Sequence, residues 1–203
     1  MPDIKNEFIA LRKRVIEDCF HKMNDRQFEG VVTAKGPVLI LAGAGSGKTT
    51  VLVNRIASLI KFGDAYNSDF VPPFINEQTI SALKNELESG IISDVFSVDA
   101  AKPWEILAIT FTNKAAGELK ERIALILDEG AEDVWAGTFH SVCGKMLRRF
   151  GDVIGYSPRF TIYDTDDQKR LMKEVYRELG LEDKMIPIKS VGVMKTQTKA
   201  KQI

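Results

Sequence analysis

A glycine-rich turn between an apolar run and an amphipathic segment is the part of this sequence that most directly suggests chemistry. Residues 41–50 read LAGAGSGKTT, follow the apolar run 37–41 and precede VLVNRIASLI. Glycines at 43, 45 and 47 allow a tight turn whose backbone N–H groups point inward, and the following helix adds its positive N-terminal end. The order of strand, turn, Lys-Thr and helix therefore predicts a phosphate-binding loop.

Two residues of this loop carry the chemistry of a nucleoside triphosphate. We expect Lys48 to reach the β- and γ-phosphates of ATP and the Thr49 hydroxyl to ligate Mg²⁺, which makes them the catalytic candidates. The loop departs from the pattern G-x-x-x-x-G-K-[ST] because Ala42 takes the first glycine position. The residues that we assign to nucleotide binding in the loop are Ala42, Gly43, Ala44, Gly45, Ser46, Gly47, Lys48, Thr49 and Thr50.

The glycines allow two other interpretations. The dinucleotide motif G-x-G-x-x-G fails, because a match that starts at Gly43 would need its third glycine at Lys48. A glycine-rich turn without any ligand is the structural alternative. The strand before the turn, the helix after it and the Lys-Thr pair in register favour the phosphate loop.

Hydrolysis also needs an acidic residue at the metal, and IALILDEG at 123–130 is the candidate. It resembles an apolar strand that ends in Asp128 and Glu129. Apolar residues at helical spacing and the helix-stopping Gly130 instead favour a helix whose solvated end carries both acids. If 123–129 were a strand beside 38–42, the chain would be a self-contained nucleotide kinase or small ATPase with both acids at the metal.

The elements that must position these residues follow from hydrophobic periodicity. The pattern predicts helices over 4–23, from Asn24 or Asp25 to Gly36, and from Lys48 to about Gly63. Unbroken apolar runs predict buried parallel strands at 38–42 and 106–110, and a shorter strand at 134–136. Further helices are predicted at 114–127, 141–150 and from Thr165, a short strand at 160–163, and fraying after 189. Alternation of strands and helices indicates an α/β fold, a parallel sheet with helices on both faces.

Composition sets wider limits. The 203 residues are 44% hydrophobic and 28% charged with no net charge, which is typical of a folded globular protein without a bulk field for polyanions. The two cysteines, Cys19 and Cys143, form no C-x-x-C pair, so neither a disulfide framework nor a zinc site is suggested. Neither a secretory signal nor a membrane span is recognisable, and we expect a cytoplasmic protein without a membrane partner.

Four motifs in one order make a resemblance specific. With MNDRQFEGV and LAGAGSGKTT, the stretches ILAITFTNKAAGELKERI at 106–123 and DVWAGTFHSVCGKMLRRF at 133–150 resemble the N-terminal motor domain of UvrD/Rep/PcrA-type superfamily 1 DNA helicases. The resemblance covers 23–150 except for an insertion at about 63–102 with paired prolines, one modest helix and, by its composition, a surface position. It implies a RecA-like P-loop domain over 1–150, and 151–203 resembles the truncated start of an inserted helical subdomain.

Carried over to this chain, the resemblance assigns further nucleotide contacts. Gln27 matches the glutamine of the Q motif, whose amide suits both edge groups of adenine, although a solvated glutamine is the alternative. Arg122 matches a helix arginine near the nucleotide, with a surface salt bridge as the competing role. The relatives often carry arginine where this chain has Thr50, which puts a nucleotide contact from that side chain in doubt.

The same resemblance makes TFTNKAA and TFHS contacts to single-stranded DNA. Phe111 offers a stacking face, and the threonines and Asn113 supply neutral donors that need no large basic patch. Helix capping by Thr112 can coexist with such binding, and a structural role is the alternative for His140. The predicted DNA-binding residues are Thr110, Phe111, Thr112, Asn113, Thr138, Phe139, His140 and Ser141.

The functional expectation is the N-terminal part of an ATP-dependent DNA helicase with ATP and Mg²⁺ as cofactors. Its expected partners are single-stranded DNA, junctions of single and double strands, and the remaining helicase domains. The acidic metal ligand and the charge-stabilising arginines of the family lie downstream of this chain, so negligible turnover is expected of the fragment alone. A non-catalytic DNA- or protein-binding module with a vestigial loop is the third possibility.

Overall fold

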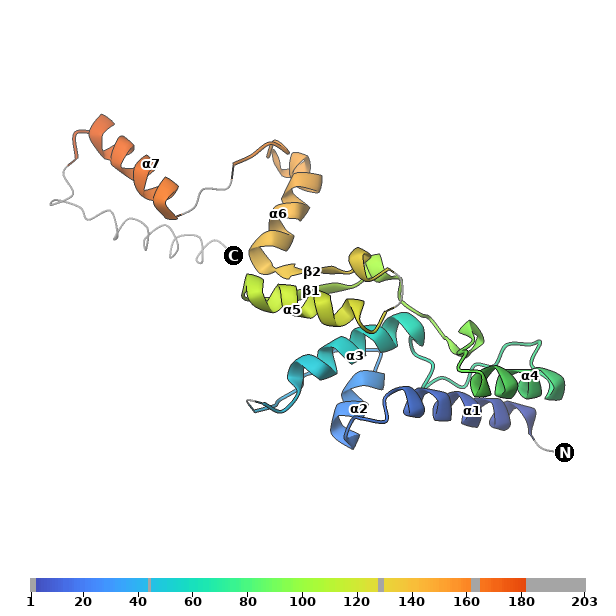
Figure 1. Ribbon diagram of the computed structural model, residues 1–203. Coiled ribbons are helices and arrows are strands. Elements are labelled where there is room, and N and C mark those ends of the chain that lie inside the picture. The colour runs from blue at the N-terminus through green and yellow to red at the C-terminus, as the bar shows by residue number, and fades with distance from the viewer. Residues whose placement is uncertain (1–2, 44, 128–129, 162–164, 182–203) are drawn as a thin grey trace. The chain divides into compact units, whose positions relative to one another are not determined.

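The computed structural model describes residues 3–43, 45–127, 130–161 and 165–181 (Figure 1). The chain divides into two compact units, Met1–Lys145 and Met146–Ile203. The α-helices are α1 (Ile4–Cys19), α2 (Asp25–Val32), α3 (Lys48–Lys61), α4 (Glu77–Glu88), α5 (Asn113–Ala124), α6 (Phe139–Phe150) and α7 (Thr165–Glu178). The strands are β1 (Leu107–Thr110) and β2 (Trp135–Thr138), and the 3₁₀ helices are η1 (Asp94–Phe96), η2 (Pro103–Glu105), η3 (Ala131–Asp133) and η4 (Gly151–Ile154).

Side-chain caps mark the starts of α2 and α5 in the first unit. Asn24 caps α2, because its Oδ1 accepts from the Gln27 amide at 2.9 Å while Gln27 Oε1 accepts from the Asn24 amide at 3.2 Å. Thr112 caps α5 through the Ala115 amide at 3.1 Å. The predicted helices over 4–23, 48–63, 114–127 and 141–150 are thus confirmed, with somewhat different ends.

β1 and β2 form a parallel ladder in which Leu107 is opposite Trp135 and Thr110 is opposite Thr138. Ala108 and Ala136, one opposite the other, are both buried with Leu119 and other α5 side chains. The alternation of strand and helix with a parallel sheet confirms the α/β fold class. Both strands end at the same edge, which is also where α5 and α6 begin.

The predicted strand at 38–42 is wrong. These residues have no regular structure, and Leu39 and Leu41 are 83% and 84% exposed. A parallel strand needs a neighbour for its backbone N–H and C=O groups. Among the described residues, β1 pairs only with β2 and no strand lies beside 38–42, so the apolar run has no ladder to join.

Helix α3 separates two buried clusters. Val51 belongs to the first cluster, which also holds side chains of α1, α2 and α4, whereas Val53, Ile56 and Ala57 belong to the second cluster with β1, β2 and α5. The lysine and threonine of the glycine-rich loop form the first turn of this same helix. Burial on two sides therefore holds the helix that carries the loop.

The segment 63–102 contributes to the first cluster. The rings of Phe96 and Phe8 stack with centroids 5.8 Å apart, and Ile80 and Leu83 of α4 are buried. The buried Arg12 guanidinium donates to the backbone carbonyl of Phe70 at 2.7 Å and to that of Ser68. The surface position expected from the composition of this segment is therefore wrong for its central residues, which complete a core.

The second unit contains η4 and α7. The Tyr156 amide donates to the Gly151 carbonyl at 2.8 Å, and the Arg148 guanidinium lies 5.4 Å from the centre of the Phe160 ring. Phe160 and Thr161 form no strand, while the rest of the strand predicted at 160–163, and the stretch predicted to fray after 189, lie outside the described residues. In the described part of the chain, no helix is long and apolar enough to cross a membrane.

Candidate nucleotide and nucleic-acid sites

The glycine-rich loop turns tightly and closes on itself. Gly45 and Gly47 adopt left-handed backbone angles, with φ of 76° and 81°. Ser46 Oγ donates to the Gly43 carbonyl at 2.7 Å, which braces the turn, while Ala44 lies outside the described residues. The turn that the glycine spacing predicts is therefore formed without a preceding strand.

The first turn of α3 offers free backbone donors. Gly47 is the N-cap residue and supplies no side-chain cap, so the amides of Lys48, Thr49 and Thr50 have no intrahelical acceptor. The Lys48 ammonium donates to the loop carbonyls of Ala42, at 3.0 Å, and Gly43. This geometry suits a phosphate group, because oxygens bound at the helix start would replace the carbonyls as acceptors for Lys48.

The loop also offers an oxygen ligand for a magnesium ion that arrives with a nucleotide. Mg²⁺ is held by a few protein oxygens together with phosphate oxygens and water, and the exposed Thr49 hydroxyl at the helix start is one such oxygen. Within the described residues, no cluster of three or more histidine, cysteine or acidic residues forms a metal site of its own. Among these residues, the Thr49 hydroxyl would need phosphate oxygens and water to complete the coordination of the ion.

Gln27 lies directly against the loop. Its Nε2 donates to the Ser46 carbonyl at 3.1 Å, and a Cβ at Gly47 would approach the same nitrogen to 3.0 Å. The structure therefore brings Gln27, predicted to read adenine, to the loop predicted to bind phosphate, although 19 residues separate Gln27 from Ser46. The positive φ favours glycine at position 47, and a Cβ there would also press on the Gln27 amide, which would have to shift by a few tenths of an ångström.

Arg55, which sequence reasoning missed, fastens α2 to α3. From α3 its guanidinium donates to the carbonyls of Gly30, at 2.7 Å, and Thr33, at the C-terminal end of α2. Burial lowers the pKa of Arg55 from its ordinary value, although a guanidinium stays charged at neutral pH. In the sequence, Arg55 follows Val51 by one helical turn, in a helix that carries no acidic residue to pair with it. This is only a weak indication that the guanidinium bonds to another element.

The described residues 123–127 of the candidate acidic segment do not form a strand. Helix α5 ends at Ala124, and residues 125–127 form a turn and an irregular position with Leu127 buried. The helical interpretation favoured from periodicity is confirmed up to Ala124, while Asp128 and Glu129 lie outside the described residues. The kinase alternative required strands at both 123–129 and 38–42, and neither described segment supplies one.

The side chains of two further nucleotide candidates are not bonded to the glycine-rich turn. Thr50 is exposed, and its carbonyl accepts from the Asn54 side chain at 2.8 Å. Arg122 is exposed in the last turn of α5. No hydrogen bond links either side chain to the glycine-rich loop among the described residues, so their nucleotide roles stay predictions.

The two predicted DNA motifs meet at one edge of the sheet. Thr110 and Thr138 are partners in the parallel register, so the residues that follow them leave β1 and β2 side by side. Thr110 Oγ1 donates to the Thr112 carbonyl at 3.2 Å, and Ser141 Oγ donates to the Thr138 carbonyl at 2.9 Å. These bonds hold the two strand ends in fixed turns.

Aromatic side chains at this edge are open to solvent. Phe111 is fully exposed and Phe139 is 59% exposed, which is unusual for phenylalanine in a folded domain. Asn113 and His140 are exposed beside them at the starts of α5 and α6. Aromatic faces next to hydroxyl and amide donors are suited to bases and phosphates of a single strand.

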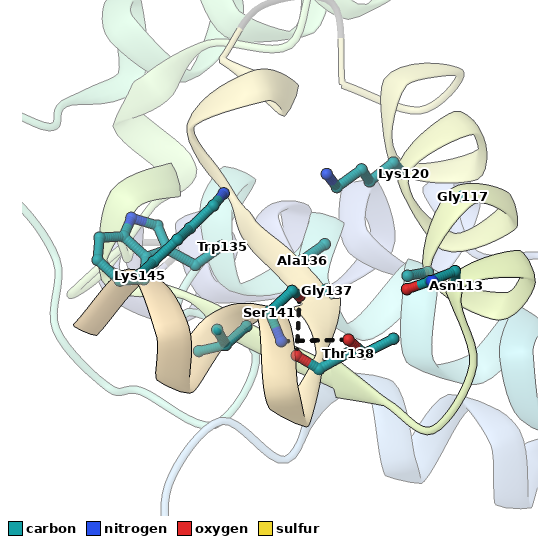
Figure 2. A pocket seen from close by; sticks show the side chains of 11 residues that line it. Asn113, Gly117, Lys120, Trp135, Ala136, Gly137, Thr138, Ser141 and Lys145 are labelled. Atoms are coloured by element: carbon teal, nitrogen blue, oxygen red, sulfur yellow. Dashed lines mark hydrogen bonds between the residues drawn. The ribbon is translucent and has the colours of Figure 1, made fainter. Parts of the chain in front are cut away.

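A pocket of about 340 Å³ continues from this edge between α5, β2 and α6 (Figure 2). Asn113, Thr138 and Ser141 were predicted to bind DNA, but the other side chains of the pocket were not singled out from the sequence. Lys120 lies seven residues after Asn113 on α5, and Lys145 four residues after Ser141 on α6. Helical spacing from the motif residues is the signal that could have found both lysines.

Comparisons with known proteins identify one family. The UvrD/REP helicase N-terminal domain model matches residues 23–71 and 91–203, leaving out 72–90 and thus all of α4. Similar curated proteins include "ATP-dependent DNA helicase PcrA" from Leuconostoc citreum, 41% identical over 168 residues, and from Bacillus subtilis (strain 168), 40% identical over 169 residues. These matches cover 82% and 83% of this chain and 18% of each relative.

The matched ranges include Gln27, the glycine-rich loop and both sheet-edge motifs. They leave out 72–90, which is a smaller segment than the insertion expected at 63–102. Helix α4 lies within 72–90 and packs into the first core cluster. The match extends over most of the chain, including the residues on which the resemblance was based. The chain therefore belongs to the UvrD/REP helicase family, in which it corresponds to the N-terminal domain.

Proposed function

We propose that this chain is the N-terminal, ATP- and single-stranded-DNA-binding part of an ATP-dependent DNA helicase that couples ATP hydrolysis to duplex unwinding. The observation that carries the proposal is the contact between Gln27 and the glycine-rich loop, Nε2 to Ser46 carbonyl at 3.1 Å. It joins a group that suits a base edge to a loop that suits phosphates. The chain spans 18% of the length of the helicases it resembles, so the unwinding activity is proposed for a longer protein.

In this proposal each loop group has one role at the nucleotide. Lys48 turns from the carbonyls of Ala42 and Gly43 to the β- and γ-phosphates, while the first amides of α3 bind phosphate oxygens. Thr49 would hold Mg²⁺ through its hydroxyl, and the ion would neutralise phosphate charge. Gln27 exchanges its bond to the Ser46 carbonyl for one to the adenine edge.

Single-stranded DNA binds along the edge where β1 and β2 end. The exposed Phe111 and Phe139 rings stack on bases, and the amides at the starts of α5 and α6 contact phosphates. We further propose junctions of single and double strands and the remaining helicase domains as partners, and a cytoplasmic location. Residues 1–150 form the RecA-like motor domain and 151–203 begin the helical subdomain.

The chain alone should bind ATP weakly and turn it over negligibly. In the described part of the chain, no carboxylate is hydrogen-bonded to the loop. Transition-state charge would therefore rest on Lys48, the helix start and the metal, without an acid to orient water. A carboxylate at the metal and an added arginine are each worth orders of magnitude in such reactions.

The test measures nucleotide and DNA binding separately on the 203-residue chain. MgATP should raise the melting temperature of the wild-type chain, and Lys48→Ala should abolish that rise; Lys22→Gln, an exposed lysine outside the loop, is the control. A labelled oligothymidylate should bind by fluorescence anisotropy, and Phe111→Ala should weaken it about tenfold.

Three results would contradict parts of the proposal. DNA-stimulated steady-state ATP hydrolysis that Lys48→Ala abolishes would show that the 203-residue chain is an active ATPase on its own. DNA binding without any nucleotide-induced stabilisation would favour a non-catalytic module with a vestigial loop. Nucleotide binding without DNA binding would remove the role of the sheet edge.

A further inference from the structure

The residues that line the pocket beside the sheet edge suit a negatively charged ligand. Its two walls are α5, with Asn113 and Lys120, and the β2–α6 segment, with Trp135 and Lys145 (Figure 2). Its remaining lining side chains are small or neutral, and no acidic residue lines it. Two cations face a concave surface that carries no compensating negative charge.

Both lysines are free to bind an external anion. Lys120 and Lys145 are exposed, and within the described residues neither ammonium group has a hydrogen-bond or ion-pair partner. By contrast, Lys35 and Lys84 of the same unit are paired with Asp64 and Glu7 at 2.8 and 2.9 Å. Two unpaired cations at one pocket repel each other modestly, and an anion between them would relieve that repulsion.

The pocket is built to hold its shape. Gly137 lets the first turn of α6 pack against β2, since a Cβ there would approach Ser141 Oγ to 2.7 Å. Ser141 is bonded to Thr138 through both its amide, at 3.2 Å, and its hydroxyl, at 2.9 Å. The wall that carries Lys145 is therefore fixed to the strand that carries Trp135.

One strand of nucleic acid fits these features better than a free anion does. The pocket joins the sheet edge through Asn113, Thr138 and Ser141, which line both. A small anion would need only the cations, whereas the half-buried Trp135 ring adds a surface that a base can contact. Cations, neutral donors and an aromatic ring in one groove are the combination that binds a single strand without sequence preference.

We propose that the path of single-stranded DNA continues from the sheet edge into this pocket, where Lys120 and Lys145 bind successive backbone phosphates and Trp135 contacts a base. This rests on the proposed DNA binding at Phe111 and Phe139 and adds a second part to it. The pocket residues position the strand and take no part in ATP chemistry.

The experiment uses Trp135 as its own reporter. The chain has two tryptophans, and the other, Trp104, is 56% exposed in η2 and does not line the pocket. In a Trp104→Phe background, titration with oligothymidylate should change the emission of Trp135. The double variant Lys120→Gln/Lys145→Gln should bind about tenfold more weakly, and its salt slope should fall by about 1.4, since each phosphate contact to a single strand contributes about 0.7.

Matched variants separate charge, position and fold. Lys120→Arg/Lys145→Arg keeps the charges and should restore binding, whereas Lys5→Gln/Lys22→Gln removes two exposed charges from the α1 region and should leave it nearly unchanged. Urea midpoints of all variants should agree, because these lysines are exposed. Equal loss in the α1-region control would show a general charge effect and overturn the proposal.

The remaining outcomes distinguish this proposal from the function on which it rests. If wild type binds DNA and Phe111→Ala weakens binding, but Lys120→Gln/Lys145→Gln does not, the pocket is outside the DNA path. An emission change produced equally by inorganic phosphate would mark a general anion site and overturn the strand assignment. If wild type binds no oligothymidylate, the proposed function of the sheet edge fails, and the extension fails with it.

Discussion

Two apolar runs of this chain look alike in sequence and differ in structure. Residues 106–110 and 38–42 each precede a polar loop and a helix, and the same argument predicts a buried strand for both. Residues 107–110 form β1, with Ala108 buried against α5, whereas 38–42 have no regular structure and Leu39 is 83% exposed. An apolar run can become a strand only where another strand completes its backbone hydrogen bonds.

The two loops that follow the runs are accordingly held in different ways. The sheet-edge loops leave a paired ladder and are fixed by the caps of α5 and α6. The glycine-rich loop leads into α3, which is buried in both core clusters. Helix α2 is bonded to the loop through Gln27 and to α3 through Arg55. The proposed nucleotide site therefore depends on helix packing in this chain, and the proposed DNA-binding edge depends on strand pairing.

The largest expected effect comes from placing a charge in each run. Ala108→Asp should lower the free energy of unfolding by about 3–5 kcal/mol, because the carboxylate would be buried without a partner. Leu39→Asp, on an exposed side chain, should change it by less than about 0.5 kcal/mol. Urea unfolding followed by circular dichroism measures both.

This pair tests the comparison directly. Equal destabilisation by the two substitutions would mean that 38–42 is buried in solution, as its sequence suggests, and that the two runs do not differ. Ala108→Ser serves as the control for volume, since a small hydroxyl adds little bulk and can bond to nearby backbone.

Within the glycine-rich loop, the positions of the glycines are expected to differ. Gly47→Ala should cost about 1–2 kcal/mol of stability, because alanine at φ 81° is strained, and it should also weaken ATP binding by crowding Gln27 Nε2. Gly43→Ala is the control for stability, since its added Cβ meets no atom within 4 Å and its φ is not positive. Comparable losses of stability in both variants would refute the strain assigned to position 47.

Much of the fold follows from local signals. Capping residues and helical spacing predict the starts of α2, α3 and α5 because those interactions lie within a few residues of one another. The strand at 38–42 was mispredicted because pairing depends on distant residues. The buried part of 63–102 was missed for the same reason, since Phe96 is buried by stacking on Phe8, 88 positions earlier in the chain.

The residues of the candidate sites also divide into those that a local pattern indicates and those that depend on contacts between distant residues. The loop, Gln27 and the two edge motifs could be recognised because each is a short pattern, and a family match includes them all. Arg55 belongs to no short pattern, and Lys120 and Lys145 are indicated only by helical spacing from Asn113 and Ser141. Their shared pocket and the Arg55 contacts become visible when α2, α5 and α6 are placed beside their neighbours. Whether the recognised residues bind ATP and DNA stays a prediction until binding is measured.

At the DNA edge, the cap of α5 should have an intermediate effect. Thr112→Ala should lower the free energy of unfolding by about 1 kcal/mol, because the Ala115 amide loses its acceptor. Thr112→Ser keeps the hydroxyl and should restore stability. A loss of oligothymidylate binding in Thr112→Ala that Thr112→Ser rescues would link the cap to the DNA edge, while unchanged stability in Thr112→Ala would show that the cap contributes little.

The smallest expected effect is the contribution to stability of Lys35, which lies just before residues 38–42. Lys35 lies 2.8 Å from an Asp64 carboxylate oxygen and 3.4 Å from one of Asp99, and these partners raise the pKa of Lys35 above its usual 10.5. A raised pKa means that the pair contributes its full stability below pH 10.5 and loses it as pH rises through the folded-state value. Lys35 is largely exposed, so the contribution is small and should shrink further in high salt.

Lys35→Gln should therefore lower the urea midpoint slightly at neutral pH and in low salt, and the difference from wild type should vanish at alkaline pH. Lys22→Gln, which removes an exposed lysine elsewhere, should show no such pH dependence. A constant difference across the pH range would mean that packing of the Lys35 side chain matters and its charge does not. The chain just before 38–42 would then be held by side-chain packing, as residues 107–110 are, and the structural difference between the two runs would be smaller.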